Sequence, residues 1–116
     1  MTKLPLCEKH AKELRDTIDN PPLYYDRTGK PISLRAWVDA WDQPEYRQVE
    51  EDFIDGARVS TMWMGTDHSF GHAPKPIIFG SAIFRAGKMV EEIETATEFE
   101  ARIAHQVLCR KLRGED

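Results

Sequence analysis

Apolar residues recur every three or four positions in three separate stretches of the chain, and this period predicts three amphipathic helices. The first covers residues 6–18 and is ended by the Asn-Pro-Pro run at 20–22, because proline disfavours helix in the residue before it. The second follows Ser33, a favourable N-cap, and buries two tryptophans on one face. The third begins at Thr97, and its expected buried stripe consists of Ala101, Ala104, Leu108 and Leu112, flanked by Phe99, Ile103 and Val107.

Between the second and third helical stretches the period falls to two, which predicts four β-strands at 46–54, 57–64, 77–84 and 89–95. Asp-Gly at 55–56 separates the first two strands and is the strongest short hairpin signal in the chain. The third strand is apolar on both faces, which indicates a central position. The fourth carries several glutamates, as edge strands often do.

The predicted order is helix, short β arm at 23–32, helix, four strands and helix. Consecutive strands with short connections usually pair as neighbours, and the helices must then cover one face of the sheet. We therefore expect a single α+β domain over residues 1–116, in which a four-stranded antiparallel β-meander packs on two to three helices. A two-fold homodimer is one way to cover the second face of the sheet.

Composition narrows the class of protein. The chain has 116 residues, of which 41% are hydrophobic and 31% charged, as in an ordinary globular domain. A net charge of −4 disfavours direct nucleic-acid binding, which needs a basic face. No apolar run is long enough to span a membrane, and the N-terminus does not read as a signal peptide. These features predict a cytoplasmic protein whose two cysteines are reduced thiols.

The loop at 65–76 carries the densest group of ionisable side chains. Asp67, His68 and His72 have atoms that could bind a metal or take part in acid–base chemistry, although the prolines and glycines of the loop argue against the helical turn that an H-x3-H pair needs. The alternative is structural. In that case Asp67 forms an Asx-type turn and Phe70 fills part of the core.

A second candidate site joins the two ends of the chain. Cys7 and His10 share one face of the first predicted helix, and His105 and Cys109 share one face of the last. If these helices pack side by side, the four side chains could hold zinc. The alternative is that the cysteines are small buried hydrophobes and the histidines lie at the flanks.

Aromatic residues form a third candidate set. Tyr24 and Tyr25 are adjacent in an extended arm, so both cannot point inward, and one is available to a partner. Trp63 is expected in the core from its strand position, but it could instead line a nucleotide-sized pocket with Asp67 and His68. No phosphate-binding glycine loop, nucleophile elbow or Cys-x-x-Cys motif occurs, so we expect no enzyme and no cofactor.

Three segments carry a resemblance to a known family: YYDRTGKPI at 24–32, VSTMWMGTDHSFG at 59–71 and PIIF at 76–79. In these segments the chain resembles small uncharacterised proteins of bacteria, prophages and phages, which share a YYDR-G-PI arm and a VST-W-G-DH-FG block. The resemblance covers about residues 24–108. It implies a phage context and a protein that acts by binding, and it brings no known activity.

The leading hypothesis is a non-enzymatic, phage-type protein that binds a host protein, with a component of a host defence system as one candidate. The alternatives are a nucleotide-binding sponge and a small metal-binding module. The residues expected to contact the ligand or partner are Tyr24, Tyr25, Trp63, Asp67, His68, Phe70 and His72.

Overall fold

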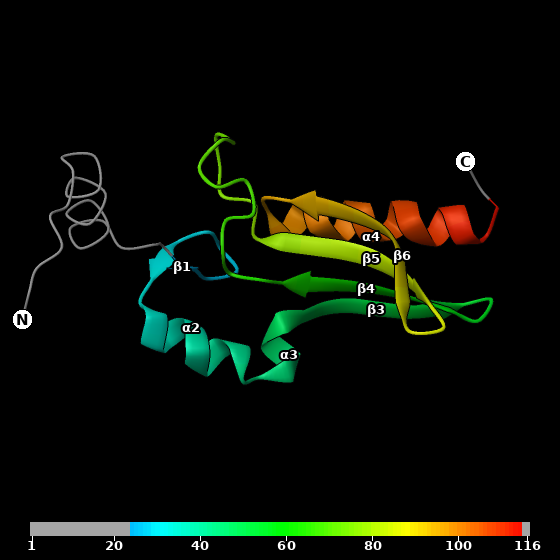
Figure 1. The fold of residues 1–116 in the computed structure, drawn as a ribbon, viewed down its shortest axis with the longest axis horizontal. Coiled ribbons are helices and arrows are strands. Elements are labelled where there is room, and N and C mark those ends of the chain that lie inside the picture. Colours follow the sequence, from blue (N-terminus) through cyan, green and yellow to red (C-terminus); the bar gives the residue numbers. More distant parts are fainter. Residues whose placement is uncertain (1–23, 115–116) are drawn as a thin grey trace, which may run out of the picture.

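The computed structural model describes residues 24–114, and the helix expected at 6–18 lies outside them. Short strands and helices come first in the chain, and four long strands and a long helix follow them (Figure 1). In chain order they are β1 (Tyr24–Tyr25), β2 (Pro31–Ile32), α2 (Leu34–Trp41), α3 (Pro44–Arg47), β3 (Gln48–Ile54), β4 (Ala57–Trp63), β5 (Phe79–Arg85), β6 (Lys88–Thr95) and α4 (Glu98–Leu112).

The four long strands form one sheet in the order β3-β4-β5-β6, and each pair is antiparallel. The expected meander and the α+β class are therefore confirmed. The turn between β3 and β4 has positive φ at both Asp55 and Gly56, at 50° and 78°. Positive φ at both central residues matches the twist of an antiparallel hairpin, which is why Asp-Gly predicts this connection correctly.

Two strands begin two residues later than predicted. Tyr46 and Arg47 belong to the short helix α3 rather than to the first strand, because Pro44 stands in its first turn with φ preset for a helix. The third strand begins at Phe79 instead of residue 77. Ile78 lies just before it, where its carbonyl accepts a hydrogen bond from the backbone of Met64 at 2.7 Å.

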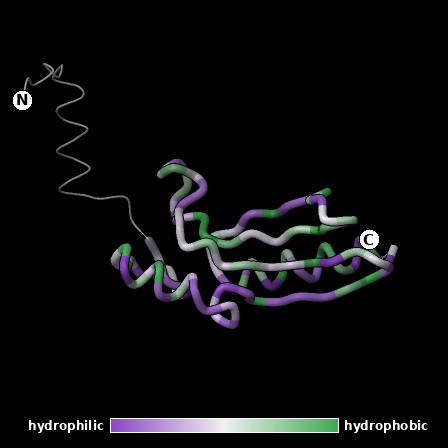
Figure 2. The backbone as a smooth tube through the Cα atoms, turned by 60° about the horizontal axis from the view of Figure 1, so that its bottom comes forward, coloured by the Kyte–Doolittle hydropathy of each residue, from purple (hydrophilic) through white to green (hydrophobic). Residues whose placement is uncertain are grey.

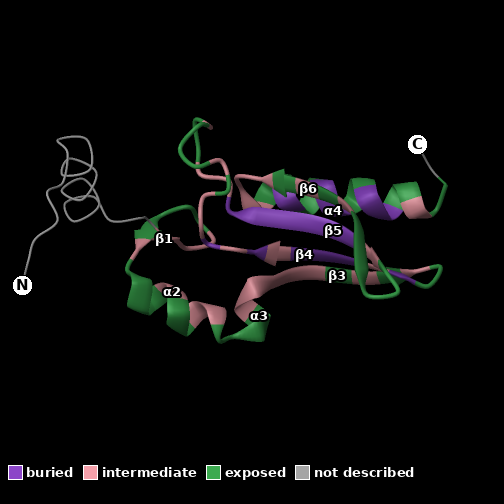
Figure 3. Cartoon of the chain, in the orientation of Figure 1, coloured by how far each residue is buried: buried purple, intermediate pink, exposed green. Residues whose placement is uncertain are grey.

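Helix α4 lies across one face of the sheet and contacts all four strands (Figure 1). The core between them is apolar at one end, where Val59, Ile83 and Leu108 meet. The central strands β4 and β5 are largely buried, whereas β3 is less so and presents a mostly hydrophilic run (Figures 2 and 3). No helix in residues 24–114 has the length and apolarity needed to cross a membrane.

Helices α2 and α3 do not cover the sheet face as expected but pack at its end, where β3 begins (Figure 1). They close around Trp63, which has no exposed surface. The Tyr46 ring meets Trp63 edge-on with centroids 4.9 Å apart, and Trp41 lies 6.2 Å away. Aromatic packing of this kind, rather than a helix layer, closes this end of the domain.

Helix α4 also carries three apolar residues on its exposed side. Phe99, Ile103 and Val107 are spaced four residues apart and are exposed, on the side opposite the buried Ala101, Ala104 and Leu108. An amphipathic helix with a single partner would carry polar residues there. The sequence pattern grouped these three residues with the buried stripe, and the structure corrects that placement.

Candidate functional site

Asp67 organises the loop between β4 and β5. One carboxylate oxygen accepts hydrogen bonds from the backbone N–H and hydroxyl of Ser69 and from the backbone of Ile77, at 2.6–2.9 Å, and the other accepts from Gly71 at 3.0 Å. Burial alone would raise the pKa of Asp67, but these hydrogen bonds outweigh it and lower the pKa to about 2. The Asx-turn expectation is therefore confirmed, and both oxygens are used inside the loop.

Phe70 stands at the tip of this loop and does not fill the core. Its side chain is 87% exposed, and its φ is 54°, in the left-handed region that non-glycine residues rarely adopt. Gly71 follows with φ 84°. The hydrogen bonds of Asp67 on either side hold this conformation, so the loop displays an aromatic ring on a fixed backbone.

The two loop histidines have different surroundings. His68 Nδ1 lies 3.0 Å from a carboxylate oxygen of Glu94 on β6, and His72 is exposed. Among residues 24–114, the group of side chains arranged to hold a metal is a different one, Asp52 with His105 and Cys109. The H-x3-H pair in the loop therefore does not form the metal site considered from its spacing.

The arm and the loop lie against one another. The backbone N–H of Tyr25 donates to the carbonyl of Gly65 at 2.8 Å, and Tyr24 forms a β-bridge with Thr66. Both tyrosines are half-buried, with the Tyr24 ring 5.2 Å from that of Trp37. Each thus keeps some exposed surface beside the loop.

Trp63 does not belong to a binding surface. It is fully buried, and its indole N–H donates to the backbone carbonyl of Tyr25 at 2.9 Å. With Trp63 sealed and Asp67 committed to the loop, the described residues do not build the nucleotide pocket considered from the sequence. The signal that placed Trp63 in the core, its position on a central strand, was the correct one.

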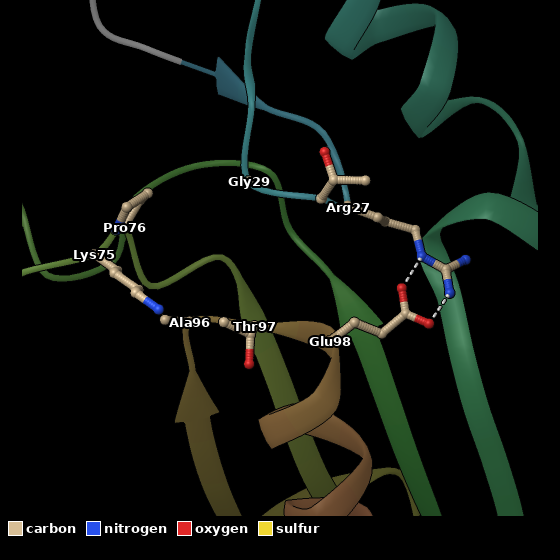
Figure 4. A pocket seen from close by; sticks show the side chains of 8 residues that line it. Arg27, Gly29, Lys75, Pro76, Ala96, Thr97 and Glu98 are labelled. Carbon is tan, nitrogen blue, oxygen red and sulfur yellow. Dashed lines mark hydrogen bonds and ion pairs between the residues drawn. The ribbon is translucent and has the colours of Figure 1, made fainter.

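A cavity of about 520 Å³ lies between the turn of the arm, Lys75-Pro76 and the start of α4 (Figure 4). Arg27 crosses this region to Glu98, with Nε 2.9 Å from Oε1 and Nη2 2.7 Å from Oε2. Its third nitrogen donates to the carbonyl of Tyr46 at 3.0 Å. Hydrogen bonding from Arg27 holds the pKa of Glu98 below its usual value. Arg27 therefore links the arm to α4, and all three nitrogens of its guanidinium are used in these contacts.

A polar network that sequence reasoning missed lies beneath α4. His105 is 1% exposed, with Nδ1 2.8 Å from Thr61 Oγ1 and Nε2 2.7 Å from Asp52 Oδ2. Thr61 Oγ1 is 2.7 Å from Ser81 Oγ, which lies 3.2 Å from the carbonyl oxygen of Ala101. The network runs from the helix backbone, through two central strands, to the edge strand β3.

The order of acidic and hydroxyl groups around His105 is similar to that of a catalytic triad, but its position is not. Thr61 and Ser81 have no exposed surface because α4 covers them. A nucleophile must reach its substrate, so neither hydroxyl can serve as one in this fold. The only part of the network open to solvent is its Asp52 end, where the carboxylate side chain is 46% exposed.

Cys109 borders the same network. Its Sγ lies 3.8 Å from Asp52 Oδ2, one helical turn beyond His105. Burial, with the nearby Asp52 charge adding to it, raises the pKa of the Cys109 thiol. Four residues near the chain ends were considered as zinc ligands. Of these, His105 and Cys109 lie together with Asp52, whereas Cys7 and His10 lie outside the described residues.

The i, i+4 spacing of His105 and Cys109 was visible in the sequence, and it correctly placed both on one helix face. The partner Asp52 was not visible, because its alternation with Phe53 shows only that the two point to opposite sides. Which side faces α4 depends on the packing.

Comparison with known proteins assigns no family or function to this site: the chain matches no protein-family model, no curated protein and no solved structure.

Proposed function

We propose that this protein acts by binding another protein, with the loop at 65–76 as its contact surface and Phe70 at the centre of that surface. The observation that carries the proposal is an 87% exposed phenylalanine held at φ 54°. Exposed aromatic rings are common anchors of protein interfaces. A strained backbone conformation persists only where the surrounding structure enforces it, and such strain is concentrated at functional sites.

Rigidity adds to this argument. Ser69 uses its hydroxyl both to donate to Asp67 and to accept from the backbone of Ala73, so the tip of the loop is cross-linked within itself. A loop that is ordered before binding loses less conformational entropy when a partner docks. The base of the loop is also closed by the backbone of His68, which donates to the carbonyl of Ile77 at 2.9 Å, two residues before β5.

Charge around the loop favours a partner with a basic contact region. Glu92 and Glu94 are exposed on β6, and Glu94 lies beside the loop at His68. Acidic groups at the rim of an interface steer cationic partners toward it. The resemblance to phage and prophage proteins favours a protein of the bacterial host, met in its cytoplasm, as that partner, including a component of a defence system.

The test is affinity capture from host lysate with the full chain and two variants. Phe70→Ala removes the displayed ring, and Phe53→Ala is the matched control, because Phe53 is 73% exposed but lies on β3. We expect a protein that is retained by the wild type and by Phe53→Ala but lost from Phe70→Ala. Equal retention by all three would contradict the proposal, as would retention of nothing specific.

A second candidate interaction is self-association through α4. The exposed stripe of Phe99, Ile103 and Val107 gives this helix apolar residues on two opposite faces, which is typical of a helix covered on both sides. A two-fold axis beside α4 would place the stripe against its own copy. This proposal moves the expected homodimer contact from the open sheet face to the helix.

A further inference from the structure

We infer that Asp52, His105 and Cys109 form a binding site for a divalent transition metal, with zinc as the ion that their chemistry fits. The imidazole nitrogen, thiol sulfur and carboxylate oxygen of these three residues all lie within 4.8 Å of one another. Nitrogen, sulfur and oxygen ligands in one small group are the combination that zinc accepts.

The hydrogen bonds behind His105 fix which nitrogen faces the ion. The carbonyl of Ala101 can only accept, so the Ser81 hydroxyl donates to it at 3.2 Å. Thr61 then donates to Ser81, and Thr61 Oγ1 must accept from Nδ1 of His105. Nδ1 therefore carries a proton, and Nε2 is directed at Asp52. Metal-binding histidines usually donate their second N–H in this way, which orients the ring.

Nε2 of His105 can contact either the Asp52 carboxylate or a bound metal ion. The 2.7 Å contact between Nε2 and Asp52 Oδ2 is a hydrogen bond, so one proton lies between these two atoms when no ion is bound. A metal ion takes the place of that proton and satisfies the nitrogen and the carboxylate together. The hydrogen-bonded pair of His105 and Asp52 is thus the metal-free form of the same site.

The spacing of the ligand atoms suits a small ion. Ligands about 2.0–2.3 Å from a tetrahedral zinc lie roughly 3.3–3.8 Å from each other. The Cys109 sulfur and the Asp52 oxygen are already 3.8 Å apart, and the His105–Asp52 contact needs to open by only a fraction of an ångström. Glu50 Oε2 lies 3.8 Å from His105 Nε2, beside the three ligands but outside their group.

Access and charge are also favourable. Asp52 and Glu50 come from β3, an edge strand, and their side chains are 46% and 28% exposed, so an ion enters from the edge of the sheet. Arg102 lies 3.5 Å from Glu50 beside the site, and its guanidinium also pairs with Glu98 at 2.8 Å.

The test is a titration of the chelator-treated full chain with Co²⁺, a spectroscopic substitute for zinc. We expect one equivalent to bind, with a sulfur-to-metal charge-transfer band in the near ultraviolet and intense visible bands of tetrahedral cobalt, all removed by added Zn²⁺. Absence of these bands would overturn the inference.

Four variants assign the ligands. Cys109→Ser is expected to remove the charge-transfer band, and Asp52→Asn to weaken Co²⁺ binding at least about tenfold. Asp52 is partly exposed, so that variant keeps its fold even if the buried Cys109→Ser does not. Cys7→Ser and His72→Ala are the matched controls and should bind as the wild type does. Loss of the band in Cys7→Ser, or its survival in Cys109→Ser, would overturn the ligand set.

Discussion

His105 Nε2 and Asp52 Oδ2 lie 2.7 Å apart although 53 positions separate them in the sequence. The contact joins the edge strand β3 to α4 and belongs to a polar network that includes the buried Thr61 and Ser81. It has consequences for stability that do not depend on metal, because the other ring nitrogen is buried against Thr61.

Thr61→Val is expected to lower the free energy of unfolding by about 1–3 kcal/mol, the usual cost of leaving a buried donor without an acceptor. Valine has almost the same shape, so the loss reflects the missing hydroxyl beneath His105 and not a cavity. Urea unfolding measures the change. Thr28→Val, at an exposed hydroxyl in the arm, is the comparison, and a smaller loss at Thr61 than at Thr28 would contradict the network.

Phe70→Gly is expected to abolish partner binding without destabilising the fold. Glycine adopts positive φ without strain, so relief of the left-handed conformation offsets its greater flexibility in the unfolded chain. Melting temperature and capture assay together check this. Ala86→Gly, at φ 51° in the turn after β5, should show the same stability change and keep binding. A large drop in melting temperature for Phe70→Gly would show that its ring packs in the fold.

Asp67→Ala is expected to destabilise the protein in a pH-dependent way. The pKa of Asp67 is lowered to about 2 in the folded state, below its ordinary value of 3.8. Its stabilising effect is therefore complete above about pH 5 and disappears as the pH falls through 4 toward 2. Unfolding curves of wild type and variant should differ at pH 7 and converge near pH 2. A difference that does not change with pH would contradict the role of the ionised carboxylate.

Arg27→Lys is expected to lower the free energy of unfolding by about 1–2 kcal/mol despite keeping the charge. Lysine cannot make the two-point contact with Glu98 and still reach the carbonyl of Tyr46. Arg35→Lys, in an exposed pair with Asp39, should change stability very little. Thermal denaturation of both variants compares them, and equal effects would argue against a special role for Arg27.

Ile103→Glu is expected to shift the protein toward monomer if α4 mediates self-association. The substitution places a charge in the centre of the exposed stripe, where it would be buried against the second copy. Light scattering coupled to size-exclusion chromatography gives the mass of each form. Gln106→Glu, which adds a charge at another exposed position of α4, is the comparison for this variant. A wild type that is monomeric at all concentrations would rule out the helix-mediated dimer.

The sheet was predictable because each strand pairs only with its neighbour in the sequence, and a period of two with an Asp-Gly turn is sufficient to indicate that. The short helix α3 was not, since Tyr46 continues the alternation of the strand and only Pro44 hints at a helical turn. Phe70 shows a different limit. A lone aromatic in a loop reads equally as a core plug or as a displayed ring, and only φ and exposure separate them.

The candidate metal site illustrates why side-chain clusters between distant elements escape sequence reasoning. Helix α4 supplies two of the three residues at a spacing visible in the sequence, but the choice among Glu50, Glu51 and Asp52 depends on which strand face meets α4. A β-bulge between Gln48 and Glu50 adds a further shift that no period reveals. The contact of Asp52 with His105 and Cys109 therefore depends on how β3 packs against α4.

The order of elements also fixes when this cluster can come into being during synthesis. The strands emerge from the ribosome one hairpin at a time, and each can pair with the one before it, but His105 and Cys109 arrive only with the final helix. Until then Thr61 and Ser81 remain open to water on the bare sheet. Docking of α4 closes the core and completes the polar network in one event, after all four strands have been made.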